Sequence, residues 1–213
     1  MIRRMGLVLA MAFLMVSCSV TPIPMGATAT AGRSLSSTPT AVAGATLTSP
    51  AEVVCDGTPT LAQTEGPYYK AGSPERSSLV EADTVGEVLL LTGRVLTTDC
   101  EPVAGAAVDV WQADGGGVYD NVEYRLRGRV RTDGGGAFAI ETVVPGEYPG
   151  RTPHIHVKVF GPDGGELLTT QIYLRGVSEQ IQDGIFNEGL LAEDLPPDAD
   201  GRRRIAFDFI VGG

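Results

Sequence analysis

The stretch GRVLTTDCEPVAGAAVDVW, residues 93–111, places an apolar segment on each side of a polar turn and predicts a strand, a loop and a second strand. Further β-rich segments follow, separated by glycine, proline and aspartate. The expected strands are Glu87 to Leu96, Ala106 to Trp111, Ala137 to Thr142, His154 to Phe160, Leu167 to Leu174 and Arg204 to Val211. The sequence therefore predicts an all-β, antiparallel sandwich or barrel with little helix, apart from one short helix within residues 177–193.

The N-terminus has the layout of a secretory signal. Two arginines precede an apolar run, Leu7 to Val16, which is too short to span a membrane and ends in small residues. We expect residues 1–17 to be a signal peptide and the protein to be extracytoplasmic. The sequence MVSC at residues 15–18 is similar to a lipobox, which predicts lipidation of Cys18 and membrane attachment, with free secretion as the alternative.

The rest of the chain divides by composition. Residues 18–50 are almost entirely Ser, Thr, Ala, Gly, Pro and Val, so they are expected to form a flexible tether. Residues 51–213 have the length of a single domain. Without Arg3 and Arg4 of the signal, the 16 basic residues become 14 against 26 acidic ones, a net charge of −12. This acidic balance argues against a nucleic-acid partner.

Two cysteines, Cys55 and Cys100, remain beyond Cys18. An even pair in an oxidising compartment predicts a disulfide, and two unpaired thiols are the alternative.

Both histidines of the chain lie in RTPHIH, residues 151–156. On a strand, His154 and His156 point to the same face about 6.5–7 Å apart, close enough to converge on one ion, while Ile155 turns towards the core. Two imidazoles do not complete a metal site, however, and two surface histidines are the alternative interpretation.

Several common metal sites are excluded by the remaining sequence. A cupin site or a facial triad requires a further histidine, which the chain lacks, and Phe160 and Gly161 stand where a cupin glutamate is expected. Cys55 and Cys100 do not have zinc-ligand spacing. Tyrosine remains as a ligand type.

Tyrosine ligation requires a strongly Lewis-acidic ion such as ferric iron, because a phenol has a pKa near 10. Tyr148 lies in the Gly/Pro loop PGEYPGR, six residues before His154, and Tyr119 follows a run of glycines. Each of these tyrosines, taken alone, fits a packing role equally well. The complete set is Tyr68, Tyr69, Tyr119, Tyr124, Tyr148 and Tyr173.

Four segments of this chain together resemble one protein family. They are QTEGPYYK (63–70), LTGRVLTTDCEPVAGAAVDVWQADGGGVYD (91–120), RGRVRTDGGGAFAIETVVPGEYPGRTPHIHVKVFGP (127–162) and TTQIYL (169–174). The ordered combination W-x-A-x-x-x-G-x-Y, P-G-x-Y-P-x-R-x-x-H-I-H and T-Q-x-Y resembles the intradiol ring-cleavage dioxygenases, which include catechol, hydroxyquinol and protocatechuate dioxygenases. The resemblance implies a β-sandwich with long active-site loops.

The resemblance also implies roles for individual residues. Tyr119, Tyr148, His154 and His156 match the four ligands of one non-haem Fe(III) per chain. Arg151 matches an arginine beside the substrate, Gln171 a glutamine near the site of oxygen reaction, and Gly66 and Pro67 a pocket-lining turn, with Tyr68 and Tyr69 as packing neighbours. The implied activity is cleavage of a catechol-type ring by O2 between its hydroxyl-bearing carbons, giving a muconate-type diacid.

A non-catalytic cell-surface binding module with a vestigial metal site is the alternative function. Larger members of the family carry an N-terminal helical region used for dimerisation, and the predicted signal and tether occupy that place here. The resemblance therefore predicts neither the oligomeric state nor the particular catechol.

Overall fold

The structure is a computed structural model that describes residues 55–176 and 183–212. The predicted signal peptide, Cys18 and the whole predicted tether, residues 18–50, lie outside this description. Within the described part of the chain, no helix is long and apolar enough to cross a membrane. The strands are β1 (Val88–Thr97), β2 (Ala107–Trp111), β3 (Arg127–Arg131), β4 (Ala137–Val143), β5 (His154–Phe160), β6 (Glu166–Tyr173), β7 (Glu193–Leu195), β8 (Arg203–Ala206) and β9 (Phe209–Val211).

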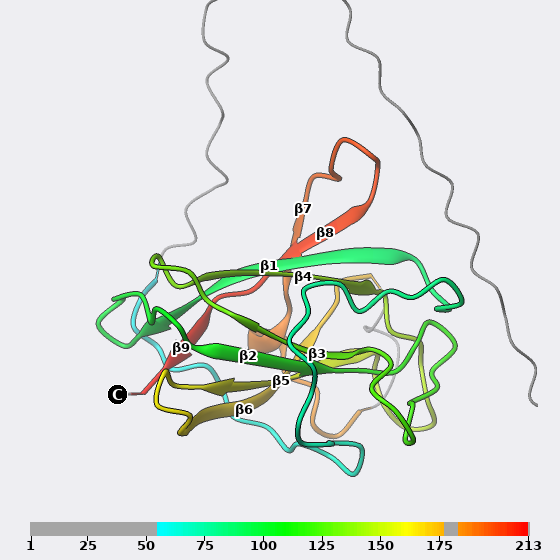
Figure 1. Ribbon diagram of the computed structural model, residues 1–213, viewed down its shortest axis with the longest axis horizontal. Helices are drawn as coiled ribbons and strands as arrows, with labels where there is room; N and C mark the ends of the chain where they lie inside the picture. The colour runs from blue at the N-terminus through cyan, green and yellow to red at the C-terminus, as the bar shows by residue number, and fades with distance from the viewer. Residues whose placement is uncertain (1–54, 177–182, 213) are drawn as a thin grey trace, which may run out of the picture. The chain divides into compact units, whose positions relative to one another are not determined.

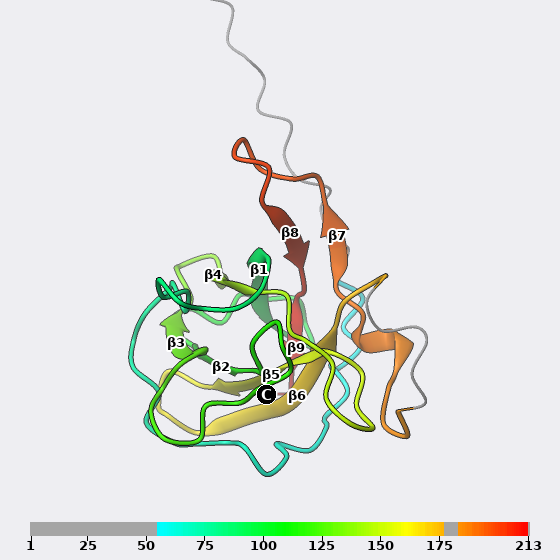
Figure 2. The same ribbon diagram turned by 90° about the vertical axis from the view of Figure 1, so that its right-hand side faces the viewer.

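These strands form two sheets that pack as layers, with the β7–β8 hairpin extending away from them (Figures 1 and 2). One sheet has the order β4-β1-β8-β7, with β9 also paired to β1, and the other has the order β3-β2-β5-β6. The pairings are antiparallel except for β8 and β9, which both run parallel to β1. The predicted all-β sandwich is confirmed, with these two parallel pairings as exceptions.

The hydrophobic core lies between the two sheets and follows the two-residue period of the strands. In β5, Ile155, Val157 and Val159 are fully buried in this core, each contributing about 1.5–3 kcal/mol by leaving water. His154, His156 and Lys158 therefore project from the opposite, outer face of the sheet. The predicted orientation of Ile155 is confirmed.

Most strand predictions agree with the structure, and the differences have local causes. The sequence does not predict β3, because three arginines in RGRVR obscure the alternation typical of a strand. One of these arginines, Arg129, forms an ion pair with the buried Asp109. The short β7 was also missed. The last predicted strand is interrupted because Asp208 turns its side chain to accept the Arg94 backbone N–H at 2.8 Å, between β8 and β9.

The predicted short helix is only partly correct. Residues 177–182 lie outside the described residues, and residues 183–193 contain the 3-10 helix η1, Glu188–Leu190, and no α-helix.

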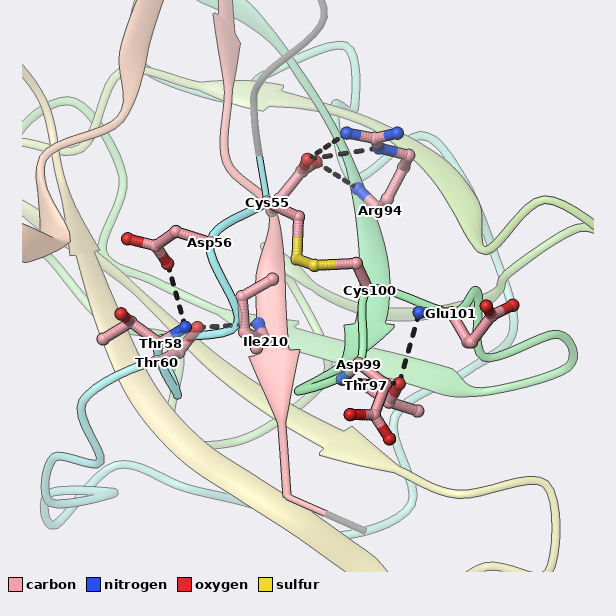
Figure 3. Close-up of a disulfide and its surroundings, with 11 residues drawn as sticks. Cys55, Asp56, Thr58, Thr60, Arg94, Thr97, Asp99, Cys100, Glu101 and Ile210 are labelled. Carbon is pink, nitrogen blue, oxygen red and sulfur yellow. Dashed lines mark hydrogen bonds and ion pairs between the residues drawn. A yellow bond between two sulfur atoms is a disulfide. The ribbon is translucent and has the colours of Figure 1, made fainter.

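Residues 55–70, which we call the N-terminal strap, begin beside β9 and continue over the outer face of the β3-β2-β5-β6 sheet. The Thr60 N–H donates to Ile210 O and the Gln63 N–H to Thr169 O, both at 2.9 Å. The predicted disulfide is present, since Cys55 is bonded to Cys100 with their Cα atoms 5.8 Å apart (Figure 3). The strap is thus fixed covalently at one end and by hydrogen bonds along its length.

Candidate active site

The two histidines lie side by side on the outer face of β5, beneath the strap. His154 is 2% exposed and His156 is 1% exposed, and their Nε2 atoms are 3.0 Å apart. Trp111, opposite His156 in the β2–β5 register, stacks on its ring at 4.8 Å with an interplanar angle of 5°. The sheet therefore holds both imidazoles in fixed positions, and the alternative of two surface histidines is excluded.

Hydrogen bonding and burial prepare His154 to be a metal ligand. Its Nδ1 lies 2.6 Å from the Thr152 carbonyl oxygen, so Nδ1 carries the proton and Nε2 keeps its lone pair. Burial lowers the pKa of His154 to about 4, and burial next to His154 lowers that of His156 well below its ordinary value. Both rings are therefore neutral at pH 7, the form that binds a metal ion.

Two loops bring Tyr119 and Tyr148 to the same place. Tyr119 follows β2, and Tyr148 lies between β4 and β5. The two loops touch at Gly117 and Glu147, where a Cβ atom added to Gly117 would lie 2.1 Å from the Glu147 carbonyl oxygen. Only glycine permits this approach. Asp114 shapes the first loop by accepting the backbone N–H groups of residues 116 and 118.

The four predicted ligand side chains form one continuous group of rings. The ring centroids are 5.8 Å apart for Tyr119 and Tyr148, 5.8 Å for Tyr148 and His154, 4.6 Å for His154 and His156, and 6.4 Å for His156 and Tyr119. Residues from three separate segments are thus brought together as the sequence predicted.

This donor set fits a ferric ion. The Tyr119 hydroxyl is buried and, within the described residues, has no hydrogen-bond partner. Burial raises the pKa values of Tyr119 and Tyr148, so these phenols would ionise only beside a strong positive charge. Residues 55–176 and 183–212 contain no group of three or more His, Cys, Asp or Glu residues that could hold a metal. The two phenols and two imidazoles are the candidate ligands.

Arg151 and Gln171, the two predicted catalytic residues outside the ligand set, meet beside Tyr148. Arg151 Nη1 donates to Tyr148 Oη at 3.2 Å, and Arg151 Nη2 donates to Gln171 Oε1 at 2.6 Å. Gln171 Nε2 in turn donates to the Thr64 carbonyl oxygen of the strap at 2.9 Å, which fixes the orientation of the amide. A guanidinium therefore faces the tyrosine oxygen at the edge of the candidate metal centre.

The strap forms one wall of the site. Gly66, in the left-handed conformation with φ 69°, packs so closely that a Cβ there would lie 3.3 Å from His156 Cε1. Tyr68 stacks on Tyr119 with centroids 4.3 Å apart, and Tyr69 packs against Trp111 at 4.8 Å, so both are packing neighbours as predicted. Pro67 is exposed at the adjacent position.

Two charged residues of the site were missed from the sequence. Asp183 is 2% exposed at its side chain and accepts from Arg151 Nε at 3.0 Å. Arg127 is 1% exposed and donates to the carbonyl oxygens of Tyr68 and Asp120, both at 2.7 Å, which joins the strap to the Tyr119 loop. No spacing pattern indicates Asp183, whereas Arg127 begins one of the four segments that carry the family resemblance.

A dioxygenase family model matches residues 64–212, which include all six predicted catalytic and metal-binding side chains. The chain belongs to the intradiol dioxygenase family. The chain is 32% identical over 173 residues to a 6-chlorohydroxyquinol 1,2-dioxygenase from Cupriavidus pinatubonensis, covering 68% of this chain and 62% of that one. It is 33% identical to a hydroxyquinol 1,2-dioxygenase from a Rhizobium species, covering 69% of this chain and 59% of the relative.

Solved structures show the same fold. The dioxygenase domain of a dioxygenase carbohydrate-binding protein fusion from Streptomyces sp. SirexAA-E is 42% identical with a TM-score of 0.67, and the match covers 73% of this chain and 99% of that chain. A 3-chlorocatechol 1,2-dioxygenase from Rhodococcus opacus 1CP is 26% identical with a TM-score of 0.64, covering 72% of each chain. The chain thus spans about three-fifths of the length of the curated relatives above but nearly all of the Streptomyces domain.

Proposed function

We propose that this dioxygenase binds one non-haem Fe(III) and uses O2 to cleave a catechol-type ring between its two hydroxyl-bearing carbons. Both oxygen atoms of O2 enter the product, a muconate-type diacid, so the reaction balances without a further reductant. The observation that carries this proposal is the convergence of Tyr119, Tyr148, His154 and His156 on one point of the outer sheet face. When bound, the ferric ion supplies the Lewis acidity that stabilises a catecholate and makes its ring reactive towards O2.

Tyr148 is the candidate proton acceptor for the substrate. A catechol that binds through both oxygens must lose its protons, and ionised Tyr148 can take one of them at Oη. Arg151 Nη1 donates to this Oη, and Tyr148 is less buried than Tyr119, which is 9% exposed and stacked under Tyr68. Tyr148 is therefore the phenol that can accept a proton during the reaction, whereas Tyr119 keeps its position.

Arg151 supplies the fixed positive charge of the site. Its guanidinium is held by Tyr148, Gln171 and Asp183 and is ionised throughout the physiological pH range. Such a preorganised cation stabilises negative charge that develops on the substrate oxygens and ring during reaction. We assign Arg151 to this electrostatic role and Gln171 to orienting it.

Apolar side chains beside the site could contact an aromatic substrate ring. A cavity of about 400 Å³ adjoins the site, with Gln63 and Thr64 of the strap on one side and Ile185 and Phe186 on the other. Phe186 packs edge-on against Tyr173 at 4.9 Å. These side chains provide apolar contacts for a ring.

We also propose an extracytoplasmic location, either lipid-anchored through Cys18 or secreted. The Cys55–Cys100 disulfide supports this location because structural disulfides persist in oxidising compartments. Cell fractionation and lipid labelling of the parent protein and Cys18→Ser test the proposal. Loss of lipid and membrane association in the variant is expected, and a cytoplasmic parent protein would contradict it.

The reaction is tested by oxygen uptake with a panel of catechols and by analysis of each product. We expect concentrated ferric protein to be red-brown, because tyrosinate bound to Fe(III) absorbs visible light, and the products to arise by cleavage between the hydroxyl groups. A colourless protein that retains no iron after ferric reconstitution would instead favour a vestigial binding module. Cleavage outside the two hydroxyl-bearing carbons would refute the intradiol assignment.

A further inference from the structure

The guanidinium of Arg151 is bound on two sides. Nη1 and Nη2 face the catalytic groups, donating to Tyr148 Oη at 3.2 Å and to Gln171 Oε1 at 2.6 Å. On the opposite side, Nε donates to Asp183 Oδ2 at 3.0 Å. In the part of the chain that the structure describes, Asp183 is the carboxylate that pairs with Arg151.

A carboxylate at Nε determines where the other two nitrogens point. The guanidinium is planar and rigid, so fixing Nε–H fixes the directions of Nη1 and Nη2. Asp183 Oδ2 also accepts the backbone N–H of Thr152 at 3.1 Å, which ties the backbone after Arg151 and its side chain to the same oxygen. The side chain therefore loses the rotational freedom that an arginine normally keeps.

Asp183 is itself held firmly. Its Oδ1 accepts the Ile185 N–H at 3.1 Å, and its backbone carbonyl accepts the Phe186 N–H at 3.2 Å. The Ile185 carbonyl oxygen in turn accepts from Gln63 Nε2 of the strap at 2.6 Å and from Tyr173 Oη at 3.3 Å. The position of the carboxylate is thus set by contacts with the strap and with β6.

The same contacts exclude a direct chemical role for Asp183. Its two oxygens accept from three N–H donors, and its side chain is only 2% exposed. Among the described residues, neither oxygen forms a hydrogen bond with Tyr148, His154 or His156. A carboxylate so placed acts through its arginine.

We infer that Asp183 is a positioning residue that holds the Arg151 guanidinium towards Tyr148 Oη and Gln171, so that its charge is in place before the reaction begins. The inference rests on the proposed function, since it assigns Asp183 to the efficiency of that reaction. A displaced catalytic group of this kind costs about 10- to 100-fold in rate.

Kinetics of Asp183→Asn and Asp183→Glu test the role. With iron content and the visible tyrosinate band unchanged, we expect Asp183→Asn to lower kcat/KM for catechol about 10- to 100-fold, with most of the loss in kcat. Asp183→Glu keeps the charge and should recover part of this loss. Equal kcat/KM for the parent protein and Asp183→Asn, or a loss fully explained by missing iron, would overturn the inference.

Asp208→Asn is a matched control. Asp208 also accepts from an arginine side chain, Arg94, at 2.8 Å and from that residue's backbone N–H, but it lies between β8 and β9, outside the active site. We expect Asp208→Asn to lower the melting temperature while kcat/KM stays within about twofold of the parent. If Asp208→Asn reduced kcat as much as Asp183→Asn, the effect would be general destabilisation and the inference would fail.

A second measurement is independent of turnover. In protein loaded with diamagnetic Ga(III), the Arg151 Nε–H gives a nitrogen–proton NMR signal that can be assigned by its loss in Arg151→Lys. We expect this signal to be protected from solvent exchange in the parent and to lose protection in Asp183→Asn, but not in Asp208→Asn. If Asp183→Asn kept the same protection from solvent exchange as the parent, the positioning role would be refuted, whether or not catechol is cleaved. If the parent cleaved no catechol but the NMR signal changed as expected, only the proposed function would be refuted.

Discussion

Removing the Cys55–Cys100 disulfide should destabilise the fold by about 4 kcal/mol while leaving the active site intact. The two cysteines are 45 positions apart, and cross-linking a loop of this length restricts the unfolded chain by about 4 kcal/mol at 25 °C. In the folded state the strap keeps its other contacts, including the bond from the Ile210 N–H to Thr60 Oγ1 at 2.8 Å (Figure 3). The loss should therefore come mainly from the freer unfolded chain.

The assay is urea unfolding of Cys55→Ser/Cys100→Ser, with Cys18→Ser in both the variant and the reference so that no free thiol can mispair. Far-UV circular dichroism follows global unfolding, and the visible tyrosinate band follows the site. For a domain of this size, 4 kcal/mol corresponds to about 8–16 °C in melting temperature. A loss below about 1 kcal/mol would refute the loop-entropy argument.

The two signals also separate global from local unfolding. If the band disappeared at lower urea than the circular dichroism signal, the strap would be detaching from the site first. That result would show that the disulfide holds Gly66 and Tyr68 in place, contrary to the expectation that the remaining hydrogen bonds suffice.

Three further predictions concern the metal, a buried arginine and pH. Tyr148→Phe should retain iron but turn over slowly, whereas His154→Ala should lose iron. Metal analysis measures the iron content, and oxygen uptake measures the turnover. Catechol cleavage at the parent's rate in both variants would contradict the ligand assignment. Arg127→Met should lower the free energy of unfolding by about 2–4 kcal/mol, because the carbonyl groups of Tyr68 and Asp120 lose their donor. The control is Arg131→Met, since the Arg131 side chain is on the same strand but 53% exposed. Urea titrations should show that this control changes the free energy of unfolding by less than about 0.5 kcal/mol. Burial raises the pKa of Asp183, but hydrogen bonds from Ile185, Arg151 and Thr152 outweigh it and hold the pKa below its ordinary value. A carboxyl group whose pKa is lower in the folded state stabilises the fold at pH values above its pKa in the unfolded chain, and this stabilisation is lost as pH falls. The difference in free energy of unfolding between the parent and Asp183→Asn should therefore shrink between pH 6 and pH 3. A constant difference would contradict this.

The ligand positions could be predicted because they depend on local sequence rules. The two-residue period of β5 places His154 and His156 on one face, and glycines mark the loops that carry Tyr119 and Tyr148. The family resemblance of the ordered motifs then grouped these residues as candidate ligands, and the structure places their rings next to one another. The core-facing position of Ile155 was predicted in the same way.

Contacts between distant segments could not be predicted. The parallel pairing of β8 and β9 with β1 joins residues more than a hundred positions apart, and alternation within a strand carries no information about its partner. The break between β8 and β9 depends on Asp208 meeting Arg94, which sequence alone does not indicate.

The sequence by itself determined that His154 and His156 share one strand face, because strand period is a local property, and its family resemblance named Tyr119 and Tyr148 as their candidate partners. Only the tertiary structure decided how the charges beside that site are held. Asp183 lies 32 positions after Arg151 and reaches it because Ile185, two positions further on, is held by Gln63 of the strap and by Tyr173. Such a pair forms through folding of the whole domain, since its free energy depends on burial and on neighbours that no short segment contains.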